Sequence, residues 1–148
     1  MELEIVEQYE NYVKFIISQI TPTFANTLRR MIMTEVPTMA IDEVIIIENT
    51  TPLYDEIVAH RLGLIPLKTD LDSYVRPEQC SCGGQGCTSC EVSLTLEKSG
   101  DKDVEIVVSS DLLSQDPKIV PVHPNIPILK MAKDQKFFLR QSLDLAEA

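Results

Sequence analysis

The chain has 148 residues, 44% hydrophobic and 24% charged, a composition typical of a folded protein with one domain or two small ones. Its 13 basic and 23 acidic residues give a formal net charge of -10 at pH 7, so the chain repels a phosphate backbone and direct contact with DNA is not expected. The acidic N-terminus does not resemble a secretory signal, and no apolar run approaches the roughly 20 residues that cross a membrane. We therefore expect a cytoplasmic protein without membrane contact.

The beginning of the chain predicts a hairpin followed by a helix. Two β-rich stretches, residues 2–7 and 12–20, lie on either side of the polar pair Glu10 and Asn11. Next, Thr21 and Pro22 are typical of a helix N-terminus, and a further proline at residue 37 prevents the helix from continuing. We expect one helix between residues 21 and 36.

This predicted helix has two different faces. At about 100° per residue, four apolar side chains share one face and should pack in the core. They are Phe24, Leu28, Met31 and Ile32. The opposite face carries an amide, two cations and a thioether, which belong to Asn26, Arg29, Arg30 and Met33. That face could dock a partner, although on spacing alone an ordinary solvated surface is the more common explanation.

Next in the chain, a strand and a short helix are predicted. Residues 40–49 are typical of a strand, and the unbroken apolar run at 44–47 suggests that both faces of its sheet are covered. A helix should then begin at Thr51 and Pro52, with acidic residues in its first turn, and end at Gly63.

The second half of the chain predicts three more strands. Residues 91–97 and 104–109 alternate around Gly100 and predict a hairpin. Four prolines make residues 116–127 a connector, because proline fits neither a helix interior nor a central strand. A final strand is expected from Lys136, with one face formed by Leu139, Gln141, Leu143 and Leu145.

All four cysteines lie within one short loop. Cys80, Cys82, Cys87 and Cys90 have the spacing of thiolates that surround one tetrahedral Zn²⁺, and the glycines between them permit the positive φ angles of a tight loop. Four cysteine ligands leave no open coordination position, so we expect a structural site. Paired disulfides, or an iron-bound or metal-free loop, are the alternatives.

No catalytic site is expected in this chain. The sequence contains no phosphate loop, nucleophile elbow, paired zinc-binding histidines or calcium loop. His60 falls near a helix end, where it is favourable as a cation, and His123 lies in the proline-rich connector. The pairs Asp42–Glu43 and Asp55–Glu56 are also unconvincing, because neighbouring strand residues face opposite ways and acids stabilise a first helical turn.

Three segments carry a family resemblance. Residues 24–30, FANTLRR, and 35–42, EVPTMAID, resemble the signature helix of the alpha-like subunits of multisubunit RNA polymerases. Residues 60–67, HRLGLIPL, resemble a second signature of that family, and the four-cysteine loop follows in the same order as in eukaryotic and many archaeal members. The archaeal D-type subunits, counterparts of the third-largest eukaryotic polymerase II subunit and of the bacterial alpha N-terminal domain, are the most similar.

The resemblance implies an α+β fold and a scaffolding role without an active site, in an enzyme complex that is a nucleotidyltransferase. Residues 1–43 and 132–148 would form a discontinuous, incomplete dimerisation domain, interrupted by an inserted β-rich domain at 44–131. The implied partners are the small alpha-like subunit, called L in archaea, the large catalytic subunits and other small platform subunits. Asn26, Arg29 and Arg30 would lie at these contacts.

The resemblance also bears on cofactors. Family members continue to a segment that in many archaea binds an iron–sulfur cluster, and then to a C-terminal helix of the dimer interface. Because this chain ends at Ala148, we expect no such cluster, only zinc. An alternative function is a free-standing zinc module that regulates transcription through nucleic acid. Residues 80–90 contain no Lys, Arg or aromatic side chain, which argues against it, and the closed cysteine shell argues against a metallohydrolase.

Overall fold

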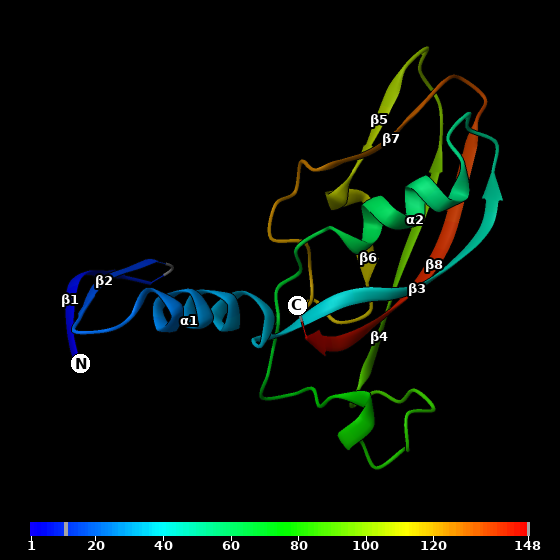
Figure 1. The fold of residues 1–148 in the computed structure, drawn as a ribbon. Helices are drawn as coiled ribbons and strands as arrows, with labels where there is room; N and C mark the ends of the chain where they lie inside the picture. Colours follow the sequence, from blue (N-terminus) through cyan, green and yellow to red (C-terminus); the bar gives the residue numbers. More distant parts are fainter. Residues whose placement is uncertain (11, 148) are drawn as a thin grey trace. The chain divides into compact units, whose positions relative to one another are not determined.

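The computed structural model describes residues 1–10 and 12–147, and its fold is α+β. These residues form two compact units, Met1–Val36 and Pro37–Glu147, here called the N-terminal unit and the sheet unit (Figure 1). Neither described helix is long and apolar enough to cross a membrane.

The N-terminal unit is a hairpin followed by one helix, as predicted. Strand β1, Glu2–Tyr9, pairs antiparallel with β2, Tyr12–Ser18, while Asn11 of the predicted turn lies outside the described residues. Helix α1 spans Pro22–Thr34, and its N-terminus is capped by Thr21, whose Oγ1 accepts a hydrogen bond from the Phe24 N–H at 3.3 Å.

The apolar stripe of α1 is not buried, so this prediction was wrong. Phe24, Met31 and Ile32 are 46%, 52% and 53% exposed, and Leu28 is half-buried. A two-stranded hairpin offers too little surface to cover a helix. As a result, no described residue of the N-terminal unit is buried.

The sheet unit is built on a four-stranded antiparallel sheet with the order β3-β8-β4-β6. Its strands are β3, Pro37–Asn49; β8, Lys136–Glu147; β4, Glu91–Ser99; and β6, Leu113–Ser114. Two further strands, β5 (Glu105–Val108) and β7 (Pro127–Met131), form a separate antiparallel pair. Two short 3₁₀ turns lie at Pro77–Gln79 and Ser109–Asp111.

Helix α2, Asp55–Gly63, packs on β3 and β7 and buries Val58 and Leu62 in the core (Figure 1). It begins four residues after Thr51, the first residue of the predicted helix. The reason is a local turn, in which the backbone N–H and the hydroxyl of Thr51 both donate to Asn49 Oδ1, at 3.0 and 2.7 Å.

The prediction that both faces of the run 44–47 are covered was also wrong. Ile45 and Ile47 are 53% and 57% exposed, whereas Val44 and Ile46 pack against the core. Irregularities in the pairing with β8, between Ile41 and Glu43 and between Ile46 and Glu48, shift the alternation twice. The apolar run in β3, a bulged strand at the edge of its sheet, therefore still has one solvent-exposed face.

The final strand agrees with its predicted pattern. Leu139, Gln141, Leu143 and Leu145 are all buried, and β8 lies between β3 and β4. In contrast, β4 and β5 do not form the predicted hairpin, because β4 pairs with β8 and β6, and β5 pairs with β7. The intervening Gly100 instead bonds to the turn before β8, donating its N–H to Gln135 O at 2.8 Å.

The strand expected to return to the first domain, β8, pairs here with β3 and β4 inside the sheet unit. A discontinuous dimerisation domain made of residues 1–43 and 132–148 stays a prediction. The connector at 116–127 has no helix, and β7 begins at its last residue, Pro127. It is joined to the rest of the sheet unit by an isolated bridge between Leu67 and Pro121 and by the side chain of Ile119, which is fully buried in the core.

Candidate functional site

The four cysteines lie on a loop between α2 and β4 whose shape is set by local backbone hydrogen bonds. Cys80 O accepts from Gly83 N at 3.1 Å, and Cys87 O accepts from Cys90 N at 3.0 Å, so each half of the loop is a tight turn. Gly83, Gly84 and Gly86 adopt φ angles of 66°, 82° and 82°, as the sequence predicted, a region that other residues enter at a cost. These turns direct all four thiols to one point.

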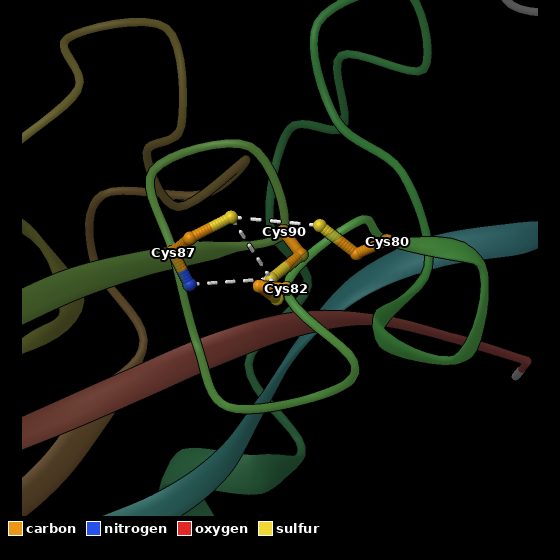
Figure 2. Close-up of side chains that lie close together, drawn as sticks. All are labelled: Cys80, Cys82, Cys87 and Cys90. Carbon is orange, nitrogen blue, oxygen red and sulfur yellow. Dashed lines mark hydrogen bonds between the residues drawn. The ribbon is translucent and has the colours of Figure 1, made fainter.

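Figure 2 shows the four sulfur atoms converging. The Sγ atoms of Cys80 and Cys87 are 3.5 Å apart, those of Cys82 and Cys90 are 3.6 Å apart, and those of Cys87 and Cys90 are 3.7 Å apart. All four lie within 4.8 Å of one another. None is in a disulfide, and the backbone N–H of Cys87 donates to Cys90 Sγ at 3.3 Å.

The thiols differ in pKa because their surroundings differ. A hydrogen bond with Cys80 is the main cause that lowers the pKa of Cys82 to about 6, and burial is the main cause that raises the pKa of Cys90 to about 12. The Ser89 N–H is the main cause that lowers the pKa of Cys87. At Cys80 the largest single cause, a hydrogen bond from the Cys82 N–H, lowers the pKa. Hydrogen bonds with the Cys82 and Cys87 thiols, together with burial, outweigh that effect, so the pKa of Cys80 is raised. A cation at the centre would favour the thiolate form of all four.

The geometry fits a metal of tetrahedral preference. Sulfur atoms bound to one Zn²⁺ at about 2.3 Å are separated by about 3.8 Å, close to the spacings within this cluster. Four protein ligands fill a tetrahedral shell, which leaves no position for water or substrate. Among the residues that the structure describes, this is the only cluster of three or more possible metal ligands.

The second set of predicted site residues lies on α1. Arg29 Nη2 donates to Asn26 Oδ1 at 3.0 Å, and Arg29 Nη1 is 3.5 Å from Met33 Sδ, so these three side chains form one connected surface. Arg30 is exposed beside Arg29. All four residues are accessible on the described chain.

Sequence reasoning missed an apolar groove within the N-terminal unit. It has a volume of about 320 Å³ and lies between α1 and the hairpin. Its lining residues are Phe15, Ile17, Ile20, Ala25, Leu28, Arg29 and Ile32. The alternation of Phe15 and Ile17 in β2 was the signal that could have indicated it. Arg29 therefore borders both the polar surface and this groove.

A polar network ties the segment before the cysteine loop to the proline-rich connector. Tyr74 donates its hydroxyl to Asp116 Oδ2 at 2.7 Å, and Lys118 Nζ donates to Asp70 Oδ2 at 2.9 Å. Burial, and then the bond to Asp116, raises the pKa of Tyr74 to about 12, while the bond from Lys118 leads the causes that lower the pKa of Asp70 to about 2. No spacing rule links residues this far apart in sequence, so the network could not be predicted.

The remaining polar residues stay dispersed. His60 is exposed in the last turn of α2, and Asp55 in its first turn accepts a hydrogen bond from Asn49 Nδ2 at 2.6 Å. His123 contributes its backbone carbonyl, which accepts from Ser109 Oγ. The described fold thus presents a closed four-thiol loop on a β-rich unit, together with an exposed two-faced helix. The four-thiol cluster is compatible with a metal site.

Comparison with known protein families gives a match over most of the sheet unit. The family model described as the RNA polymerase Rpb3/RpoA insert domain matches residues 40–145. The chain belongs to this family.

Several curated relatives are named DNA-directed RNA polymerase subunit Rpo3. The relative from Methanosarcina acetivorans is 47% identical over 140 residues, which cover 94% of this chain and 52% of the relative. The one from Archaeoglobus fulgidus is 42% identical over 138 residues, covering 93% and 51%. The one from Pyrobaculum neutrophilum is 42% identical over 146 residues, covering 99% and 55%. The chain thus spans about half the length of the curated relatives it matches.

Proposed function

We propose that this chain is part of a non-catalytic assembly platform of a DNA-directed RNA polymerase, of the archaeal D type. In this role it pairs with the small alpha-like subunit L and docks the large catalytic subunits and other small platform subunits. Family membership and the names of the relatives support the proposal.

The single observation that carries this proposal is the uncovered N-terminal unit. None of its described residues is buried, although both its strands and its helix carry large apolar side chains. Burying such side chains contributes about 1.5–3 kcal/mol each, so an uncovered set of them favours association with another chain. The groove between α1 and the hairpin is the natural place for a helix from the small alpha-like partner.

A pairing experiment tests the proposed contact with the small alpha-like subunit. Co-expression with the small alpha-like subunit, followed by size-exclusion chromatography, should give a heterodimer peak. Ile32→Asp should abolish that peak, because it places a charge in the groove. Lys14→Gln, which changes the net charge by the same one unit at an exposed hairpin position outside the groove lining, is the matched control. A persistent monomer with the unsubstituted chain would contradict the pairing role of this chain.

The cationic surface of α1 is proposed to capture the second-largest subunit. Arg29 and Arg30 are exposed cations in a chain of net charge -10, and Asn26 and Met33 hold the Arg29 guanidinium in place. Reversing both arginines to glutamate should reduce capture by a reconstituted platform about tenfold or more at moderate salt.

The control for this experiment has the same change in net charge. Lys102→Glu with Lys133→Glu alters two exposed cations of the sheet unit and should leave capture unchanged. If both double variants capture equally well, the assignment of the α1 face is wrong.

We also propose that the cysteine loop binds structural zinc through Cys80, Cys82, Cys87 and Cys90. Thiolate ligation can contribute on the order of 10 kcal/mol to ordering a segment with no core of its own. When bound, the metal cross-links the two turns of the loop, and the protein supplies four thiolates in fixed positions.

Metal analysis of protein purified without added zinc tests the site. We expect about one equivalent of zinc, lost on Cys82→Ser and retained on Ser89→Ala, which alters the loop without removing a ligand. Iron in place of zinc, or less than about half an equivalent of metal, would overturn the assignment.

A further inference from the structure

A second apolar groove lies in the sheet unit, where α2 meets β7. Its volume is about 400 Å³, and apolar side chains from two distant segments form most of its wall. The lining residues are Pro52, Leu53, Arg61, Pro127, Leu129 and Lys130. Leu129 is buried and Leu53 is partly buried, so packed side chains form the base of the groove. The two prolines are exposed at its rim, where their rings restrict the backbone.

The exposed face of α2 adds to this apolar surface. Ile57 is 42% exposed and lies one helical turn before Arg61 on α2, and Tyr54 and Leu64, which flank the helix, are 75% and 69% exposed. Val58 and Leu62 are the fully buried residues of the helix. Aromatic, aliphatic and arginine side chains together are the composition that interfaces favour.

Both charged side chains that line this groove are cations. Arg61 Nη1 donates to the Ile128 carbonyl at 2.7 Å, which holds the guanidinium at the rim with its remaining N–H groups available. Lys130 is the other cation. In the part of the chain that the structure describes, neither one has an ion-pair partner, although the chain as a whole has a net charge of -10.

We propose that this groove binds a segment of a partner polypeptide in which apolar side chains adjoin carboxylates. The apolar side chains would fill the space between the prolines and Leu129, and the carboxylates would meet the guanidinium of Arg61 and the ammonium of Lys130. This site goes beyond the platform role proposed above, because it uses α2 and β7 and none of the α1 residues.

A peptide titration tests the chemistry of the occupant. The probe is a short blocked peptide of alternating leucine and glutamate, added to the full isotope-labelled chain, with chemical shifts as the readout. Resonances of Leu53, Leu129 and Lys130 should move. A matched peptide with lysine in place of each glutamate should bind at least about tenfold more weakly. If the two peptides bind equally, or if the shifts fall outside the groove, the proposal is overturned.

Paired variants test the position. Lys130→Glu should weaken binding of the glutamate peptide about tenfold, whereas Lys133→Glu, an equal charge change on a nearby turn outside the groove, should change it by less than about twofold. Equal effects of the two variants would refute the assignment. The Arg29 and Arg30 double variant should bind the peptide normally, so failure here is distinguishable from failure of the platform role.

A second copy of the chain is the competing occupant. Sedimentation over a range of concentrations should show no self-association that depends on Lys130. If the chain dimerises and Lys130→Glu abolishes the dimer, the groove belongs to a second copy and the proposed partner is wrong.

Discussion

The buried amide of Gln141 offers the sharpest test of the packing of the sheet unit. Gln141 is 1% exposed on β8, between Leu139 and Leu143, which are fully buried. Neither its Nε2 nor its Oε1 has a hydrogen-bond partner among the described groups. Burying an amide without partners costs about 1–3 kcal/mol in proteins. Gln141→Leu, which keeps a similar volume, should therefore raise the free energy of unfolding by about 1–3 kcal/mol.

Urea unfolding followed by circular dichroism measures this change, since the midpoint should rise while the slope stays constant. Arg140→Leu is the matched control, because it adds the same side chain at the neighbouring exposed position and should stay within about 0.5 kcal/mol of the parent. A lower midpoint for Gln141→Leu would mean that the folded protein satisfies the amide, for example with buried water, and would refute the reasoning.

Three further variants test other parts of the sheet unit. Leu143→Ala empties a fully buried position and should lower the free energy of unfolding by about 3–5 kcal/mol in the same assay; a loss below about 1 kcal/mol would contradict the core assignment. Asp70→Asn removes a carboxyl whose pKa the bond from Lys118 helps lower to about 2, so the stabilisation it provides is present above about pH 4 and is lost as the pH falls through about 2. The difference in unfolding free energy between parent and Asp70→Asn should therefore shrink over that window, and a difference constant with pH would be inconsistent with this role. Tyr74→Phe should cost about 1–2 kcal/mol because it deletes a half-buried hydrogen bond, whereas Tyr54→Phe, with a ring that is 75% exposed, should cost almost nothing.

Local patterns predicted the elements that depend on neighbouring residues. Thr21 and Pro22 marked the start of α1, since a cap and a first-turn proline act within one turn. The alternation from Leu139 to Leu145 predicted β8 and its buried face. The cysteine loop was equally open to prediction, because its four cysteines and its positive-φ glycines lie within eleven consecutive residues.

What escaped prediction depends on contacts between distant residues. The pairing of β5 with β7 joins segments separated by the proline-rich connector, and a plausible turn at Gly100 suggested the wrong neighbour. No residue type in the sequence marks the positions of the two bulges in β3, so the exposure of Ile45 could not be predicted. The amphipathic pattern of α1 correctly predicted a helix with one apolar face. Such a pattern does not indicate whether the surface that covers the apolar face belongs to the same chain.

The two bulges of β3 have a protective consequence. This strand is the outer member of its sheet, and thirteen residues of regular edge would offer a template on which any extended peptide could add. The irregularities at Asp42 and Ile47 cut that template into stretches too short for stable addition, and Glu43 and Glu48 beside them repel acidic strands. The bulges should therefore lower the tendency of this isoleucine-bearing edge to template fibril growth.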